Sequence, residues 1–288
     1  MKFQGIFVDS STPFDSDGAL YRIKIEHNIA KWNQTSVAGY ILGGYCGEGA
    51  FLSAEEKLEL WKLSAAAAGP AKILIAGVDE AGTIEAARMV NLAADLGFHA
   101  ALVETPHADI RMSRAETQLL FYRSVADRAR IPVWIANRPG ATGVALSVDT
   151  LAALAKHPNI GGIVDHSGEP SNIQRLGGAT LLWGDEGSLW RALQCGASGA
   201  ALALANAVPF AAIALWEAHR TREDDAGLDW QSRIAPPAEL VCARLPIAGL
   251  KHAMDVNGYY GGQPRLPLSG LNPAQKREVE QAFAYLKS

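Results

Sequence analysis

The sequence predicts an α/β fold in which strands and helices alternate and close into a (βα)8 TIM barrel. Eight short apolar runs alternate with amphipathic segments of helical length, and the runs are apolar on both faces, as in parallel strands covered by helices. Successive runs begin roughly 20–35 residues apart without a long linker, and no glycine-rich dinucleotide fingerprint follows the first one. These observations favour a closed barrel over a doubly wound open sheet.

The expected strands follow one another along the first part of the chain. They span residues 5–8, 38–42, 72–77, 100–104, 133–136, 161–164, 180–184 and 199–204. Two helix starts carry the Ser-x-x-Glu pattern of a capping box, at Ser53 and at Ser113. We expect the barrel to span residues 1–208. Residues 209–288 show helical patterns, broken at Pro236 and Pro237, and should add the last barrel helix and a C-terminal helical extension.

Composition narrows the class of function. The 288 residues carry a formal net charge of −4 and contain no basic run, so no binding surface for nucleic acid or for an anionic membrane is expected. The three cysteines lie far apart and are odd in number, which indicates reduced thiols, and the N-terminus lacks the apolar stretch of a signal peptide. We expect a cytoplasmic protein whose partner is a small carboxylate or carbonyl metabolite.

In a (βα)8 barrel the reacting groups lie at the carboxyl ends of the strands, just after each apolar run. Polar side chains are frequent at these positions, and a hydrophobic core alone would not need them. They are Tyr45, Cys46, Glu48, His107, Asn137, Arg138, Asp165, His166, Ser167, Asp185 and Asn206. The sequence therefore predicts a polar site at this end of the barrel.

Short motifs connect these positions in a fixed order. They are STPF (11–14), GGYCGE (43–48), LSAEEK (52–57), AGV (76–78), TP (105–106), ANRPGATG (136–143), HPNIGGIVDHSG (157–168), GDE (184–186), GASGAALALANAVP (196–209) and PRLPL (264–268). Together they resemble the dihydrodipicolinate synthase / N-acetylneuraminate lyase family of pyruvate-dependent aldolases over essentially the whole chain. The resemblance implies a barrel with three C-terminal helices, commonly assembled as a homotetramer of tight dimers.

The resemblance also implies a division of labour that this chain does not keep. In the family, a GTTGE-like loop binds the pyruvate carboxylate, a tyrosine transfers protons, and a lysine in a GIKD-like strand forms an imine with the substrate. Here Val164 stands at the lysine position and Ala136 at the tyrosine position, while Ala108 and Ala141 replace a further tyrosine and an arginine. Valine offers no nucleophile, so we predict that imine chemistry is absent.

Four residues are candidates for catalysis: His166, Asp165, His107 and Cys46. A histidine titrates near neutral pH, and the neighbouring carboxylate of Asp165 could orient His166 as a general acid or base. The alternative is a loop histidine that caps a backbone group, and the same choice applies to His107. Cys46 precedes a helix and could be a nucleophile, or it could be a small buried thiol in place of threonine.

The remaining polar positions are predicted to bind the substrate. They are Gly44, Tyr45, Cys46, Glu48, Asn137, Arg138, Asp185 and Asn206. Arg138 is the expected carboxylate anchor because a planar guanidinium binds carboxylates bidentately, whereas Tyr45 either contacts the ligand or fills the space left by Ala136. A divalent metal could stabilise an enolate without a lysine, but no HxH or HExxH spacing supports one, so we expect no metal and no cofactor.

Three functions fit this pattern. In the first, the protein is a lyase or aldolase-like enzyme that acts on a small keto-acid or sugar-acid metabolite by acid/base chemistry without an imine. In the second, it is a catalytically inactive homologue that binds a small molecule or regulates a partner through the same pocket. In the third, it is a structural subunit of a lysine-bearing paralogue. The polar rim favours the first two, and the resemblance favours a homo-oligomer, either dimer or tetramer.

Overall fold

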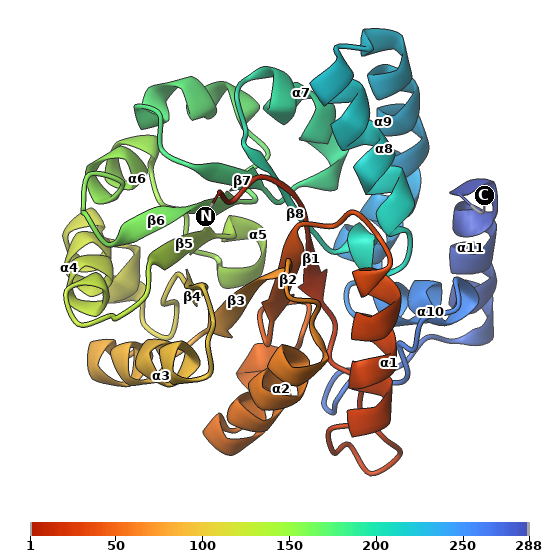
Figure 1. The fold of residues 1–288 in the computed structure, drawn as a ribbon, viewed down its shortest axis with the longest axis horizontal. Helices are drawn as coiled ribbons and strands as arrows, with labels where there is room; N and C mark the ends of the chain where they lie inside the picture. The colour runs from red at the N-terminus through yellow and green to blue at the C-terminus, as the bar shows by residue number, and fades with distance from the viewer. Residues whose placement is uncertain (1, 287–288) are drawn as a thin grey trace.

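The computed structural model describes residues 2–286 and contains a closed barrel of eight parallel strands in sequential order (Figure 1). The strands are β1 (Gly5–Ser10), β2 (Gly39–Leu42), β3 (Ile73–Val78), β4 (Ala100–Glu104), β5 (Val133–Asn137), β6 (Ile160–Asp165), β7 (Leu181–Trp183) and β8 (Gly199–Leu202). β1 pairs with both β2 and β8, which closes the sheet on itself. The predicted fold class is therefore confirmed, with a strand at each expected position.

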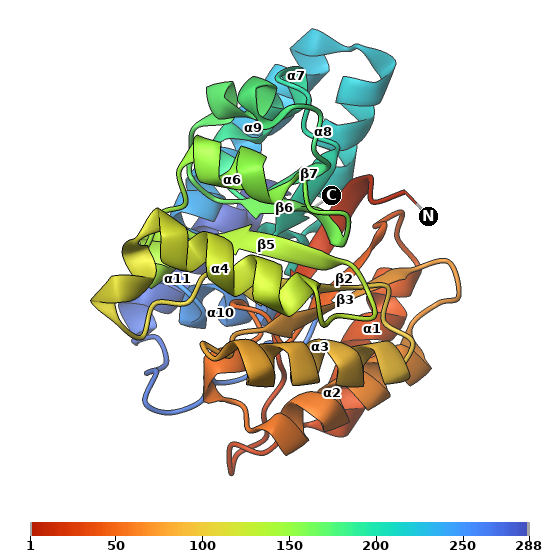
Figure 2. The same cartoon turned by 90° about the vertical axis from the view of Figure 1, so that its left-hand side faces the viewer.

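Helices cover the outside of the barrel, and the side view shows α3 and α4 next to each other along its wall (Figure 2). These helices are α1 (Arg22–Asn33), α2 (Ala54–Ala67), α3 (Thr83–Asp95), α4 (Ala115–Ala126), α6 (Val148–Leu154), α7 (Leu189–Gln194) and α8 (Pro209–Thr221). The short α5 (Pro139–Thr142) lies instead at the carboxyl end of the barrel, directly after β5. Short 3-10 turns occur at Gly49–Phe51, Ile110–Ser113, Pro170–Leu176, Glu186–Ser188, Leu204–Asn206 and Ala284–Leu286. No helix in the described part of the chain has the length and apolarity needed to cross a membrane.

One of the two predicted capping boxes is confirmed. The Glu56 amide donates to Ser53 Oγ at 3.2 Å, and the Ser53 amide donates to Glu56 Oε2 at 2.9 Å, so α2 begins where the pattern places it. The prediction at Ser113 is wrong, because α4 begins one residue later with Arg114 as its N-cap. The Ser113 hydroxyl instead donates to the Ile110 carbonyl at 2.7 Å and completes the preceding 3-10 turn.

The barrel interior is apolar at mid-height and polar toward the carboxyl ends of the strands. One inward-facing side chain from each strand forms the apolar layer: Phe7, Ile41, Ile75, Leu102, Ala136, Val164, Leu182 and Ala201. Because side chains alternate between the two faces of a strand, residues two positions further on also face inward. They are Asp9, Gly43, Gly77, Glu104, Arg138, His166, Gly184 and Ala203. A layer with three ionisable strand-end groups and a histidine therefore lies directly on the apolar one.

The C-terminal extension consists of α9 (Asp224–Ala238), a π-helical segment (Glu239–Arg244), α10 (Ala248–Val256) and α11 (Pro273–Phe283). The predicted break at Pro236 and Pro237 is wrong, because both prolines lie inside the last turns of α9. A proline lacks the amide hydrogen that a helix needs, and the chain responds by widening into the π-helical segment instead of ending. α9 packs against α8 at the edge of the barrel (Figure 1).

A buried ion pair fastens the extension to the barrel mouth. Lys251 Nζ on α10 lies 2.7 Å from Glu48 Oε1 and donates to the Thr12 carbonyl at 2.8 Å and to the Gln263 carbonyl at 3.0 Å. The Arg265 amide donates to the other oxygen of Glu48 at 2.7 Å. These contacts join the loop after β2 to the extension, so the C-terminal residues form a fixed wall over the carboxyl ends of the strands.

Candidate functional site

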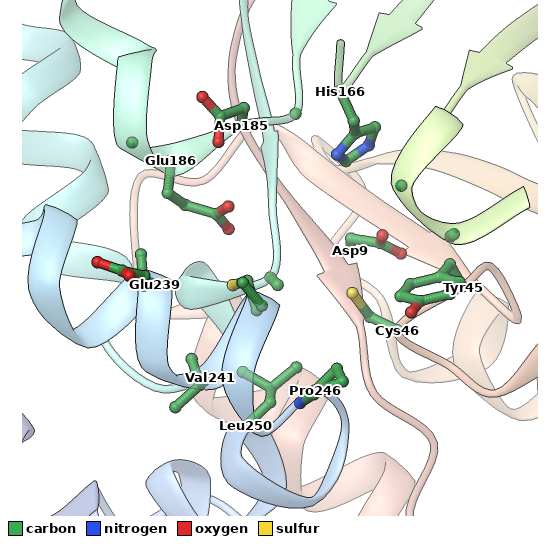
Figure 3. Close-up of a pocket in the computed structure, with 18 of the residues that line it drawn as sticks. Asp9, Tyr45, Cys46, His166, Asp185, Glu186, Glu239, Val241, Pro246 and Leu250 are labelled. Atoms are coloured by element: carbon green, nitrogen blue, oxygen red, sulfur yellow. The ribbon is translucent and has the colours of Figure 1, made fainter. Parts of the chain in front are cut away.

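A cavity of about 710 Å3 lies between the carboxyl ends of the strands and the C-terminal extension. The close-up shows Asp9, Tyr45, Cys46 and His166 on the barrel side, with Asp185 and Glu186 across the cavity from Tyr45 and Cys46 (Figure 3). The extension supplies the facing wall through Ala235, Pro236, Ala238, Glu239, Val241, Cys242, Ala243, Pro246, Ile247 and Leu250. The cavity therefore has a polar floor from the strand ends and a mostly apolar cover.

Arg138 is the charged centre of the floor. Its side chain is 7% exposed, and its Nη2 donates to Asp9 Oδ2 at 3.2 Å while its Nε lies 3.9 Å from Glu104 Oε2. The guanidinium carbon also stacks 4.6 Å from the ring centre of Tyr45. Burial opposes the charge, but Asp9 and Glu104 outweigh it, so the pKa of Arg138 is raised and the group stays charged. For Glu104, burial also disfavours the charged form and therefore raises the pKa, although the nearby Arg138 acts in the opposite direction.

His166 lies above the apolar layer with its ring against Gly184. Its Nε2 is buried and has no hydrogen-bond partner among residues 2–286. A Cβ atom on residue 184 would lie 2.2 Å from His166 Cε1, so only glycine leaves room for this ring position. Burial and the nearby charge of Arg138 hold the pKa of His166 well below its usual value. The imidazole is therefore neutral at physiological pH.

The expected orienting contact between Asp165 and His166 is replaced by other contacts. Asp165 Oδ1 accepts from Asn137 Nδ2 at 2.8 Å and from the Ser167 amide at 3.0 Å, and its Oδ2 accepts from the Ser167 hydroxyl at 3.0 Å. Adjacent residues of a strand point to opposite faces, so His166 enters the barrel while Asp165 faces outward. The pairing inferred from their adjacency is thus corrected, and Asp165 positions the loop.

His107 lies in a second, smaller cavity of about 290 Å3, which Glu104 also lines. Its Nδ1 is 3.1 Å from the Thr105 carbonyl oxygen. Tyr45 lines both cavities, and its stacking with Arg138 forms part of the partition between them. His107 and His166, which the sequence suggested as one catalytic group, therefore line two neighbouring cavities that share Tyr45, Ala141, Pro246 and Ile247.

Cys46 is buried in the floor of the main cavity. Burial and the neighbouring Asp9 carboxylate raise the pKa of its thiol well above the usual value, so the sulfur stays protonated near neutral pH. A thiol in this state is a poor nucleophile, which favours the alternative of a small buried side chain. Cys242 on the opposite wall is in the same state, through burial and the proximity of Glu186.

Three further predicted ligand-binding residues make contacts within the protein. Glu48 holds Lys251 and the Arg265 amide, as described above. Asn137 accepts from the Leu146 amide at 3.0 Å, and Asn206 joins the Ser11 amide to the Asp9 carbonyl. These side chains hold the rim of the barrel together. The main cavity is lined by Tyr45, Cys46, Arg138, His166 and Asp185, whereas Gly44 and Glu48 line the smaller one.

Sequence analysis did not select Asp9, Glu104 or Glu186 as site residues, although Glu104 and Glu186 stand at predicted strand ends. Asp9 directly follows the first apolar run and Glu104 ends the fourth, each two residues after an inward-facing apolar side chain, and that spacing was the available signal. Glu186 is 4% exposed, and its Oε1 accepts from the Leu204 amide at 3.1 Å. Burial raises its pKa to about 7. The described residues contain no cluster of three or more potential metal ligands.

Comparison with known proteins defines the family. The family model for the dihydrodipicolinate synthetase family matches residues 2–285. The chain belongs to this family. It is 30% identical over 290 positions to a 4-hydroxy-tetrahydrodipicolinate synthase of an Exiguobacterium species, covering 98% of this chain and 97% of that protein. It is 32% identical over 299 positions to the protein of that name from Xanthomonas axonopodis pv. citri, covering 99% and 96%.

Solved structures of the dihydrodipicolinate synthetase family share the fold. A dihydrodipicolinate synthase from Acinetobacter baumannii, solved in complex with pyruvate, superposes with a TM-score of 0.92 at 27% identity over 99% of both chains. N-acetylneuraminate lyase from Proteus mirabilis superposes with a TM-score of 0.90 at 22% identity over 100% of this chain and 99% of that one. At a coarse level, the family supports assignment of the chain to the lyases.

The contact between Gly184 and His166 yields a stability prediction. Gly184→Ala should lower the free energy of unfolding by about 1–3 kcal/mol, because the new methyl group overlaps the imidazole. His166→Ala should remove most of that penalty, so a double-mutant cycle measured by urea denaturation should show strong coupling. Gly187→Ala, in the same loop with only ordinary contacts at 3.5 and 3.7 Å to Asp185, is the control. Additive effects of the two changes would contradict the placement of the ring.

Glu186 should make stability depend on pH. Its folded-state pKa of about 7 exceeds the ordinary 4.5, so between these values the folded protein holds a proton that the unfolded chain has lost. The free energy of unfolding of the wild-type protein should therefore fall as pH rises from 4.5 to 7. Glu186→Gln does not titrate, so across this window it should gain about 3 kcal/mol of stability relative to wild type. Denaturant titrations at pH 4.5–8 would measure this, with Glu239→Gln on the exposed rim controlling for loss of charge. If the difference in unfolding free energy between wild type and Glu186→Gln did not change with pH, burial of the Glu186 carboxyl group would be contradicted.

Proposed function

We propose that this chain is a lyase that acts on a small keto-acid or sugar-acid metabolite without forming an imine. The observation that carries the proposal is the pair Val164 and Ala136. They are register partners on β6 and β5 and are sealed in the apolar layer of the barrel. According to the family resemblance, these are the positions of the imine-forming lysine and the proton-transferring tyrosine. Neither side chain can attack a carbonyl or move a proton.

Other lysines do not replace the missing amine. The lining of the main cavity, within the described chain, includes no lysine. Lys251 is bound to Glu48 and two carbonyl groups, and Lys57 is paired with Asp79 and Glu80. Lys72 donates to the Thr35 and Val37 carbonyls at 2.7 and 2.8 Å, at the start of its strand and away from the cavity. These contacts support chemistry that uses no lysine.

The polar floor offers an alternative to the imine. In a lyase reaction that passes through an enolate, negative charge develops on the carbonyl oxygen of the substrate. Arg138 would stabilise that charge, and the neutral imidazole of His166 would polarise the carbonyl group by donating a hydrogen bond. Glu186, protonated in part near neutral pH, would supply or accept the proton that the reaction moves. Asp9 would hold Arg138 in position through the contact described above.

The second candidate is a homologue that binds the same class of metabolite without turning it over. The protonated thiol of Cys46 and the internal contacts of Asp165 favour it, because two of the four predicted catalytic side chains are thereby unsuited to direct catalysis. For either candidate we propose a cytoplasmic homo-oligomer, a dimer or tetramer, in keeping with the family resemblance. Neither candidate requires nucleic acid, a membrane, a metal or a cofactor.

Reductive trapping tests the absence of an imine. Incubation with pyruvate and sodium borohydride should leave the intact mass of the protein unchanged, since Val164 has no amine to reduce onto the substrate. A lysine-dependent pyruvate aldolase treated in parallel should gain the mass of the reduced adduct. An adduct on this chain, mapped by peptide mass spectrometry to any lysine near the cavity, would refute the central claim.

Ligand binding and turnover separate the enzyme from the binder. Keto acids and sugar acids that occupy the cavity should raise the melting temperature, because they bind only the folded state. Arg138→Lys should weaken that binding about tenfold, since lysine keeps the charge but loses the planar fork. For any acid that is turned over, His166→Ala should lower kcat by roughly 100-fold or more with a smaller effect on binding. Binding without turnover would support the second candidate, and full activity of His166→Ala would exclude the proposed role of the imidazole.

A further inference from the structure

The C-terminal extension presents an apolar wall to the main cavity. Ten of its residues line the cavity, and among these described residues Glu239 alone carries a charge. Val241 and Leu250 are each 1% exposed and Ile247 is 8% exposed, so the wall reaches well below the molecular surface. Figure 3 shows Val241 and Leu250 on the side of the cavity away from His166. Hydrophobic side chains with a few placed polar groups are the usual lining of a ligand pocket.

Ile247 is held in this wall by a strained backbone conformation. Its φ is 62° and its ψ is −64°, and the Ala248 amide donates to the Pro246 carbonyl at 2.7 Å, so the three residues form a γ-turn of the rare type. A positive φ is unfavourable for a β-branched side chain, and such conformations cluster at active sites and ligand-binding sites. The turn lies where the two cavities meet, because Pro246 and Ile247 line both. The structure therefore keeps an apolar side chain here against a backbone cost.

The cavity is larger than a three-carbon keto acid needs. Pockets of roughly 300–1,000 Å3 accommodate drug-sized ligands, and this one measures about 710 Å3. Val164 and Ala136 close the barrel beneath the polar floor, with exposures of 0% and 1%. A substrate whose carboxylate and carbonyl group meet Arg138 and His166 therefore extends away from the floor, and the apolar wall lies on that side.

The chemistry of the wall decides between keto acids and sugar acids. A sugar acid carries a hydroxyl group on most of its carbons, and each hydroxyl loses hydrogen bonds to water when it enters an apolar site. The thiol of Cys242 is only a weak donor and does not replace them. Asp185 and Glu186, from the loop after β7, already accept hydrogen bonds within the protein. An alkyl or aromatic group instead gains affinity by leaving water for the wall.

We propose that the substrate is a 2-keto acid with an alkyl or aromatic substituent larger than a methyl group, and that Val241, Ile247 and Leu250 determine this specificity. The inference rests on the proposed function, because it places the keto-acid group on the floor of the main cavity. It narrows the substrate class to apolar keto acids and excludes sugar acids. The carbonyl chemistry at Arg138 and His166 is unchanged, since the wall contacts only the substituent.

A homologous series of keto acids tests the inference. Pyruvate, 2-oxobutanoate, 2-oxopentanoate and 2-oxohexanoate share the keto-acid group, and each differs from the next by one methylene group. Isothermal titration calorimetry should show the affinity rising about three- to fourfold with each added methylene, because each one leaves water for the apolar wall. Pyruvate should therefore be the weakest ligand of the four.

A second pair of acids tests the polarity of the wall at constant size. 2-Oxoglutarate and 5-methyl-2-oxohexanoate have the same number of non-hydrogen atoms and the same branching, but the first ends in a carboxylate and the second in an isopropyl group. The isopropyl acid should bind at least about tenfold more tightly, because an apolar wall does not compensate a second carboxylate for its lost hydration.

Variants assign the effect to the wall. Ile247→Ala removes apolar contact area, so 2-oxohexanoate should bind about tenfold more weakly while pyruvate binds as it does to wild type. If this variant does not fold, Val241→Thr keeps the side-chain shape, adds a hydroxyl group and should weaken binding of 2-oxohexanoate about fivefold. Ile84→Ala makes the first substitution at a side chain that is 79% exposed on α3, and this matched control should bind the whole series as wild type does.

The possible outcomes separate this inference from the proposed function. Equal affinities along the series, tighter binding of 2-oxoglutarate than of the isopropyl acid, or wild-type behaviour of the wall variants would overturn the specificity of the wall and leave an imine-free lyase intact. A rising series together with a borohydride-reduced pyruvate adduct would overturn the proposed function and leave the role of the wall standing. Failure of every keto acid to bind would contradict both.

Discussion

The ion pair between Asp9 and Arg138 organises the mouth of this barrel. Asp9 lies on β1 and Arg138 directly follows β5, four strands away in a closed ring of eight, so the contact spans the barrel from one side to the other. Removing two charges from water is costly, and a buried pair is stable only when its geometry and neighbours compensate. Here Glu104 adds a second carboxylate and Tyr45 stacks on the guanidinium. Burial is the main cause of the pKa shifts of His166 and Cys46, and this pair adds to them: Arg138 further lowers the pKa of His166, and Asp9 further raises that of Cys46.

The apolar layer beneath explains why the polar groups lie at this height. Val164 and Ala136 are adjacent and fully buried, and they contribute to a continuous hydrophobic interior with Leu182 and Leu102. An amine placed among these side chains would lose its hydration without a partner, which disfavours its charged form. In this chain the ionisable groups therefore lie one inward-facing position further along their strands.

The C-terminal extension completes the site without supplying most of its charges. Its π-helical segment places Val241 and Cys242 over the cavity, and π-helical turns often occur at functional positions. Lys251 and Glu48 fix it to the loop after β2, the same loop that carries Tyr45 and Cys46. Any movement of the extension would therefore also move the residues that divide the two cavities. Glu48 thus has a structural role that its position in a ligand-binding motif conceals.

The sequence by itself determined the fold, the strand positions, the start of α2 at Ser53 and the end of the barrel at which polar groups gather. Each of these depends on local signals: apolar periodicity, a capping box, and the common direction of parallel strands. That the side chain of Val164 cannot act as a nucleophile was equally readable, because it concerns the identity of one residue. Tertiary structure alone decided which polar groups meet. Asp165 and His166 are neighbours in sequence but face opposite sides of the sheet, and His107 lines a different cavity from His166. Asp9 and Arg138 are 129 residues apart, and only closure of the barrel brings them into contact. A local pattern specifies the face on which a side chain lies, whereas its partner is set by the packing of the whole sheet.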